Sequence, residues 1–203
     1  VYDVSVARLS DGKRYAFLAR ATTTKQFMVV DVTATDSPVS VGSYSLANVS
    51  SVGSFPQGFR VSYYGGYVYV TARETTGPEL HVFDVSNPAA IHEVGSGTEL
   101  NKTAEEFVIA EKHGRRYLFM ASDSNLKELD VYDITNPSLV TEVVAAAQNL
   151  PGNVDGSSIF ILDNRLYFGR LNYASGPELL VYDASDPATG LPILGSANVA
   201  ANI

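Results

Sequence analysis

Short runs of apolar, aromatic and β-branched residues alternate along the whole chain with turns rich in glycine, aspartate and asparagine. The second quarter shows this most clearly, with predicted strands at 59–64, 67–71, 79–84 and 91–95. Such composition is typical of strands, and the pair Gly65-Gly66 between the first two favours a tight hairpin. Because no segment has the 3.6-residue period of a helix, the pattern predicts an all-β protein.

The other quarters of the chain repeat this order of strands. The first two strands of each are predicted at 4–9 and 15–18, at 107–110 and 117–120, and at 158–162 and 166–168. The segment 143–148 has helical composition, but it falls where a fourth strand belongs, and we predict a strand there. Many strands are apolar on both alternating faces, as in 179–182, which indicates coverage on both sides.

One phrase of nine residues recurs along the chain. Leu80-His-Val-Phe-Asp-Val-Ser-Asn-Pro88 returns at 129–137 and 179–187, and 27–33 is a weaker copy. The aspartates of the phrase lie 53, 49 and 50 residues apart: Asp31, Asp84, Asp133 and Asp183. A period in this range indicates a repeat architecture built from one supersecondary unit.

Four strands for each repeat, covered on both faces, predict a β-propeller with four blades, each a four-stranded antiparallel sheet. A β-sandwich is the alternative, but that fold gives no reason for nearly the same sequence to recur in the third strand of each repeat. Closure of the ring would rest on packing of the first blade against the fourth. An open part of a larger propeller, completed by further repeats or a second copy, is the other alternative. The predicted single domain, 1–203, has repeats at approximately 1–52, 53–103, 104–152 and 153–203.

The repeated phrase also carries a resemblance to a known family. Preceded by Tyr67-Val-Tyr-Val70, it resembles the LVIVD repeat, and Tyr2-Asp-Val-Ser-Val6 resembles the first strand of that repeat. The resemblance extends over essentially the whole chain in four copies, although 33–37 departs from the Ser-Asn-Pro turn. It implies a β-propeller on a bacterial or archaeal cell surface. The resemblance implies no common enzymatic activity.

Composition narrows the classes of partner. The chain has 203 residues, of which 45% are hydrophobic and 18% charged, so it can bury a core. The net charge of −8 argues against binding to nucleic acid or electrostatic docking to anionic lipid. The absence of cysteine excludes disulfides and thiolate sites. No apolar run approaches the roughly 20 residues that span a bilayer, so we expect no direct membrane insertion by this segment.

The chain begins at Val1, without a methionine, directly on a predicted strand. We therefore expect it to be a domain cut from a longer protein, with any export signal or anchor outside it. The expected location is extracellular or at the cell surface.

Two sets of acidic residues recur with the repeat. The aspartates of the phrase precede Ser/Thr-Asn-Pro turns, and we predict that they accept backbone N–H groups there rather than act in chemistry. A second set lies 28 residues earlier: Asp3, Pro56, Glu105 and Asp155, with Glu106 competing with Glu105 for its place. The carboxylates Asp3, Glu105 and Asp155 would line the central channel of a propeller, where they could bind calcium or another hard cation. Solvated strand-start carboxylates are the alternative. No other cofactor is expected.

The loops between second and third strands differ most between repeats, and in a propeller all would emerge on one face. Function commonly lies on loops carried by a rigid scaffold. The candidate ligand-binding residues of these loops are Arg20, Arg73, Asp123 and Asn172. Ordinary solvated hairpin loops are the alternative. The histidines occupy unrelated repeat positions and no catalytic motif is present, so we predict no catalytic residues.

These patterns favour a non-catalytic cell-surface or extracellular module that binds a protein or glycan, alone or within a larger surface protein or filament subunit. Self-assembly is a further expected mode of interaction. Two alternatives remain: a metal-assisted enzyme with a site in the central channel, and a purely structural spacer.

Overall fold

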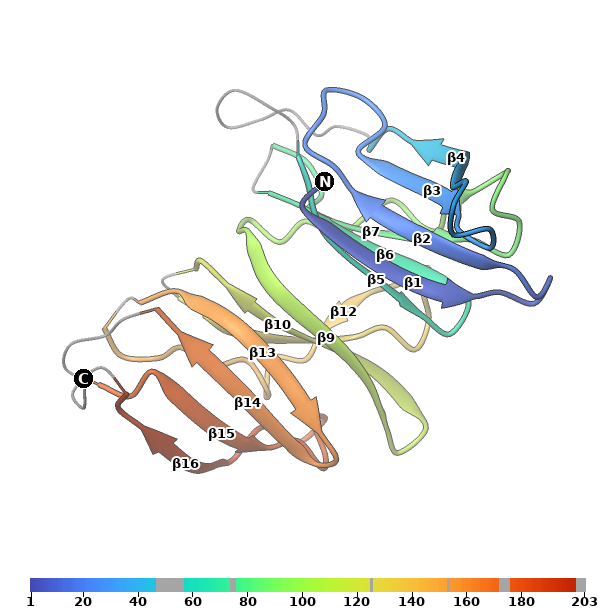
Figure 1. Cartoon of the computed structure of the whole chain (residues 1–203). Coiled ribbons are helices and arrows are strands. Elements are labelled where there is room, and N and C mark those ends of the chain that lie inside the picture. Colours follow the sequence, from blue (N-terminus) through green and yellow to red (C-terminus); the bar gives the residue numbers. More distant parts are fainter. Residues whose placement is uncertain (47–56, 74–75, 125, 153, 172–175, 200–203) are drawn as a thin grey trace. The chain divides into compact units, whose positions relative to one another are not determined.

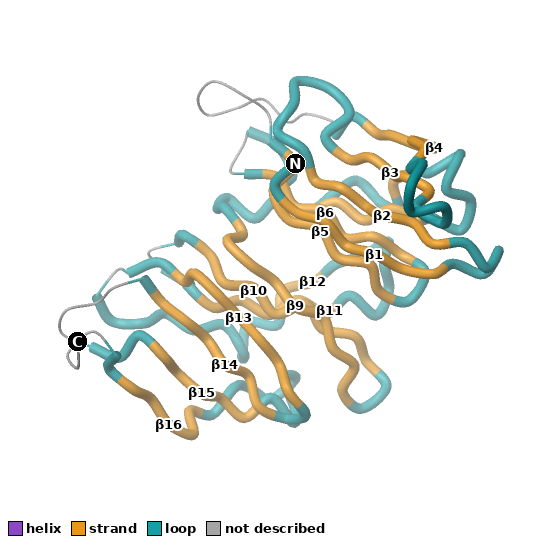
Figure 2. The backbone as a smooth tube through the Cα atoms, viewed as in Figure 1, coloured by secondary structure: helices purple, strands orange, loops and turns teal. Residues whose placement is uncertain are grey.

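The computed structural model describes residues 1–46, 57–73, 76–124, 126–152, 154–171 and 176–199. These residues form strands, turns and loops, and none of them is helical (Figures 1 and 2). The prediction of an all-β protein is confirmed.

The chain divides into two compact units, Val1–Thr103 and Ala104–Ile203. Each unit contains two antiparallel four-stranded sheets whose strands follow one another in sequence order (Figure 1). The sheets of the first unit are β1 (Asp3–Arg8), β2 (Arg14–Ala19), β3 (Phe27–Asp31) and β4 (Val39–Tyr44), and β5 (Gly58–Tyr64), β6 (Tyr67–Ala72), β7 (Leu80–Asp84) and β8 (His92–Glu93). Those of the second unit are β9 (Ala104–Lys112), β10 (Arg115–Ser122), β11 (Leu129–Asp133) and β12 (Thr141–Glu142), and β13 (Gly156–Leu162), β14 (Arg165–Arg170), β15 (Leu179–Asp183) and β16 (Ile193–Ala197).

Each repeat therefore forms one blade-like sheet of four strands, as the sequence predicted. The second and third strands supply most of the buried apolar surface, because their side chains alternate between two covered faces. In the first unit Phe17, Phe27 and Phe83 are fully buried and their rings are in contact along the core. In the second unit Phe168 and Tyr182 are fully buried within one cluster. Burial of one such side chain stabilises the fold by about 1.5–3 kcal/mol.

The prediction that strand 179–182 is covered on both faces is wrong for β15, which is buried on one face only. Leu180 and Tyr182 are buried, whereas Leu179 is 37% exposed on the other face. The same sheet exposes Phe160 of β13, and the sheet of β1 exposes Val6. One face of each of these two sheets is therefore not covered. The predicted closure of a ring by the first and fourth blades stays a prediction.

Glycine allows close approach between successive sheets of a unit. A Cβ atom on Gly58 would lie 2.8 Å from the carbonyl oxygen of Gln26, and one on Gly156 would lie 2.7 Å from that of Glu128. Both glycines begin the first strand of a sheet, and both approach the residue just before the third strand of the preceding sheet. No side chain fits at these positions without displacing the backbone.

The repeated aspartates have the structural role predicted for them. In every repeat the Oδ1 atom accepts the backbone N–H two residues further on, at 2.7–2.9 Å. The acceptors are Asp31, Asp84, Asp133 and Asp183, and the donors are Thr33, Ser86, Thr135 and Ser185. The hydrogen bond from the Ser86 amide lowers the pKa of Asp84, as expected for an anionic acceptor.

The strand predicted at 143–148 is wrong. β12 ends at Glu142, and 144–146 form a turn in which the Ala146 amide donates to the Val143 carbonyl. Pairing with β11 resumes only at Gln148, through an isolated bridge to Leu129. The turn carries Ala146 into the buried core of the second unit, so tertiary packing overrides continuous pairing here.

Candidate functional site

The loops that follow β2 and β6 meet at one edge of the first unit. The carbonyl of Arg20 accepts the Gly58 amide at 3.0 Å, and the Arg73 amide donates to the Gln57 carbonyl at 3.1 Å. Ala21 and Gln57 also form an antiparallel bridge. Two of the predicted ligand-binding residues, Arg20 and Arg73, are thus brought to the same edge from different repeats.

An arginine–aromatic cluster, defined here as Tyr2, Phe59, Arg60 and Arg73, lies at this edge. The Arg73 guanidinium carbon lies over the Phe59 ring, 4.3 Å from its centroid, and 5.7 Å from the Tyr2 centroid. Arg60 contacts the same Phe59 ring at 4.4 Å. The Tyr2 and Phe59 rings meet edge-to-face at 5.3 Å. Phe59 is buried, whereas Tyr2 is 44% exposed and Arg73 is exposed.

Arg20 and Arg73 differ in how their side chains are held. Arg20 is half-buried, and its guanidinium donates to the Lys25 carbonyl at 3.3 Å, within its own loop. Arg73 forms no ion pair with any described residue, and its guanidinium lies near the rings of Phe59 and Tyr2. Arg73 is therefore the more accessible cation at this edge.

The remaining two predicted loop residues do not belong to this edge. Asp123 follows β10 in the second unit and is half-buried. It acts electrostatically on Asp155, which the sequence assigned to the channel set. Asn172 lies outside the described residues.

The carboxylate of Asp3 is hydrogen-bonded to backbone amides. Its Oδ2 atom accepts the Val61 amide of β5 at 2.9 Å, and its Oδ1 atom accepts the Val4 amide at 2.8 Å. Ser5, two residues further along β1, accepts the Tyr63 amide in the same way. β1 therefore uses alternate polar side chains to bind the first strand of the next sheet.

The pairing of strands identifies the residue equivalent to Asp3 in the third repeat. Asp3 pairs with Ala19, and Glu106 pairs with Ala121, and both alanines lie twelve residues before the turn aspartate of their repeat. Glu106 also accepts the amide of the next residue, as Asp3 does. Glu106 is the structural counterpart of Asp3, and Glu105, which the count of 28 residues selected, is its neighbour.

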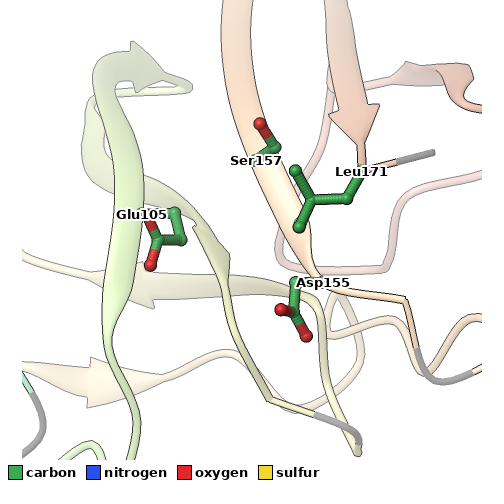
Figure 3. A pocket seen from close by; sticks show the side chains of 5 residues that line it. Glu105, Asp155, Ser157 and Leu171 are labelled. Carbon is green, nitrogen blue, oxygen red and sulfur yellow. The ribbon is translucent and has the colours of Figure 1, made fainter.

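Glu105 and Asp155 line one cavity of the second unit. The cavity has a volume of about 160 Å³, and Gly156, Ser157 and Leu171 complete its lining. Figure 3 shows Glu105 on β9, across from Ser157 of β13, with Asp155 just before β13 and Leu171 just after β14. Burial raises the pKa of Asp155, and the nearby Asp123 carboxylate raises it further.

A cation site formed by Asp3, Glu105 and Asp155 together stays a prediction. Among the described residues, no group of three or more histidine and acidic side chains is arranged to hold a metal ion. Within the same part of the chain, no helix is long and apolar enough to cross a membrane.

A series of buried acceptors escaped the sequence reasoning. The residue five positions before each turn aspartate is buried, and its side chain accepts a backbone amide 20 to 22 residues later. The pairs are Gln26 with Leu46, Glu79 with Leu100, Glu128 with Leu150, and Glu178 with Val199. These side chains bind the segment that leaves each sheet. The recurring Glu-Leu at 79–80, 128–129 and 178–179 was the available signal, but no structural role was predicted for these glutamates.

The family comparison identifies one of the repeats directly. The model of the LVIVD repeat matches residues 59–98, which span β5 to β8. The resemblance inferred from the repeated phrase is confirmed. A comparison with curated proteins gave no sequence match.

Several solved structures are similar in fold. The chain superposes on a GH43 protein of the Bacteroides ovatus xyloglucan PUL with a TM-score of 0.54 and 14% identity, covering 94% of this chain and 40% of that one. It is also similar to an exo-β-1,3-galactanase of Phanerochaete chrysosporium bound to β-1,3-galactotriose, with a TM-score of 0.59, 13% identity, and coverage of 97% and 49%. An exo-β-1,3-galactanase of Clostridium thermocellum gives a TM-score of 0.54 at 11% identity, covering 96% and 48%.

The chain spans less than half the length of each of these solved proteins. Because they are β-propeller enzymes, the likeness supports the β-propeller fold predicted from the repeats. At this level of identity the likeness concerns the fold alone.

Proposed function

We propose that this chain is a non-catalytic β-propeller module that binds a glycan or a protein at the cell surface or outside the cell. The observation that carries this proposal is that the backbones of Arg20 and Arg73, from different repeats, bind the same segment, 57–58, and that the Arg73 guanidinium lies beside the partly exposed ring of Tyr2. Exposed aromatic and arginine side chains on a rigid scaffold are typical of binding surfaces. The resemblance to the LVIVD repeat supports the proposed location.

The test is binding of the purified chain to a glycan array and to a panel of purified surface proteins. We expect Arg73→Ala to remove most of the binding signal. Arg14→Ala is the matched control, because Arg14 is an exposed arginine at the opposite end of β2 from Arg20, about 20 Å away along the strand. If the two variants lost binding equally, or if no ligand bound the parent chain, this function would be wrong.

A second candidate is an enzyme that uses Glu105 and Asp155 for acid–base chemistry on a glycoside. The specific observation in its favour is that the two carboxyl groups line one cavity and that the pKa of Asp155 is raised. A pair of carboxyl groups with different proton affinities is the usual requirement for glycoside hydrolysis. The fold likeness to exo-β-1,3-galactanases suggests β-1,3-linked galactose oligomers as the first substrates to assay.

Release of galactose from β-1,3-galactotriose, followed by chromatography, tests this candidate. Activity that is lost in Glu105→Gln and Asp155→Asn, but kept in Ser158→Ala, would support it over the binding module. Isothermal titration calorimetry with Ca²⁺ and Mg²⁺ tests the metal-assisted version of this enzyme. That version requires a heat of cation binding for the parent chain and a smaller heat for Glu105→Gln. If the chain is a purely structural spacer, we expect neither ligand binding nor turnover. Its sedimentation should then depend on concentration, because the chain would associate with itself.

A further inference from the structure

We propose that the arginine–aromatic cluster binds the carboxylate of an acidic saccharide, such as a polymer of uronic acid. Arg73 would bind the carboxylate and the Tyr2 ring would contact the adjoining sugar face. This inference rests on the proposed function, because it names the ligand class of the same surface.

The contacts of Arg73 with the described residues leave hydrogen-bond donors of its guanidinium available. Its guanidinium carbon lies over the Phe59 ring, 4.3 Å from the ring centroid. The five N–H donors of a guanidinium lie at its edge, in the plane of the group. Because Arg73 forms no ion pair with a described residue, these donors can meet the two oxygens of a carboxylate, the anion whose geometry they match.

The stacking also orients the arginine before a ligand arrives. Phe59 is buried at 4% exposure and its ring is also contacted by Arg60, so we expect the ring to hold a fixed position. An arginine held against a fixed ring loses less conformational freedom on binding than one that is free in solvent. This preorganisation favours a specific contact over a merely electrostatic one.

Acidic residues adjoin the cluster in the sequence, and the charge of one of them is partly compensated by the backbone. Asp3 is adjacent to Tyr2 in the sequence, as Glu74 is to Arg73, and both carboxylate oxygens of Asp3 accept backbone amides, from Val61 and Val4. Its negative charge is therefore partly compensated by these dipoles. The chain as a whole carries a net charge of −8, which opposes long-range attraction of anions. Affinity must then arise from the short-range contacts of the cluster.

The size of the surface favours a saccharide over a protein. The accessible groups of the cluster are one partly exposed ring, that of Tyr2, and one guanidinium, that of Arg73. A stable protein interface buries about 800 Å² on each partner, whereas a ring and a guanidinium match the dimensions of one or two sugar units. A tyrosine ring presents an apolar face with a polar tip, which suits the mixed C–H and hydroxyl surface of a sugar.

Calorimetric titration with a galacturonate tetramer, its fully methyl-esterified form and a glutamate tetrapeptide tests the inference. We expect the tetramer to bind and the ester to bind at least tenfold more weakly, because only the carboxylates differ. Arg73→Gln should lower the affinity for the tetramer at least tenfold, and Arg73→Lys should recover little of this loss. Arg14→Gln should leave the affinity unchanged. Tyr2→Ala should lower the affinity for both the tetramer and its ester. Circular dichroism verifies that each variant is folded.

The outcomes separate this inference from the proposed function. Equal binding of the tetramer and its ester, both dependent on Tyr2, would overturn the acidic ligand and leave a glycan-binding module. Equal binding of the glutamate tetrapeptide would overturn the saccharide in favour of an acidic protein segment. Absence of tetramer binding, or binding unaffected by Arg73→Gln, would also refute the inference, whereas the glycan and protein panels decide the proposed function independently.

Discussion

Replacement of Glu128 tests the structural role of the buried acceptor series. Its Oε2 atom accepts the buried Leu150 amide at 2.7 Å, and the side chain is fully buried. In Glu128→Ala this hydrogen bond is lost, at about 1 kcal/mol, and the amide is left without an acceptor, which costs a further 1–3 kcal/mol or so. We expect the free energy of unfolding to fall by about 2–4 kcal/mol.

Glu128→Gln should behave differently, because the first repeat already has a glutamine at this position. Gln26 accepts the Leu46 amide through Oε1 at 3.1 Å. The other oxygen of Glu128, Oε1, is buried without a hydrogen-bond partner among the described residues. A neutral amide is less costly than a carboxylate in such a place. We therefore expect Glu128→Gln to stay within about 1 kcal/mol of the parent chain.

Urea unfolding followed by circular dichroism near 215 nm measures both variants, since the chain has no tryptophan for fluorescence. Loss of 2–4 kcal/mol corresponds to a decrease in Tm of roughly 5–15 °C for a chain of this size. Glu142→Ala is the control, because Glu142 only pairs with Lys127 at the surface, at 2.5 Å, and should cost less than about 1 kcal/mol. Equal costs for Glu128→Gln and Glu128→Ala, or a cost of Glu128→Ala below that of the control, would refute the reasoning.

Two further predictions concern sheet packing and acid stability. Gly42→Ala should destabilise the first unit by about 1–3 kcal/mol in the same urea assay, because its Cβ would lie 2.3 Å from the Pro88 carbonyl oxygen, whereas Gly195→Ala, with open space around it, should not. The Tm should fall below about pH 4, because hydrogen bonds lower the pKa of Asp31, Asp84 and Asp183 in the folded chain; their contribution is complete above the unfolded pKa and is lost as pH falls through the folded one. Asp84→Asn should flatten this dependence, and an unchanged Tm–pH curve for that variant would contradict the assignment.

The sequence was informative wherever one residue type recurs at one point of each repeat. The aspartates 31, 84, 133 and 183 revealed the period and, with it, the number of strands and their order. Their role as turn acceptors also followed from local chemistry, since each bonds an amide only two residues away. Local rules of this kind require no knowledge of how the sheets pack.

Candidate binding residues were predicted less completely. The loops of Arg20 and Arg73 were selected from their variability between repeats, but the contact of Arg73 with Tyr2 and Phe59 depends on how the first two sheets pack. The shift from Glu105 to Glu106 depends on pairing across β9 and β10, which counting along the chain does not reveal. Such pairings join residues far apart in sequence.

The sequence by itself determined the repeat, the all-β class and the turn role of the aspartates, because each depends on interactions within a few residues or on a simple period. Tertiary structure alone decided which polar side chains are buried acceptors and which are exposed. Glu128 and Glu142 are both glutamates, yet one binds a buried amide and the other a surface lysine. That difference arises from burial, which depends on contacts between sheets and not on residue type.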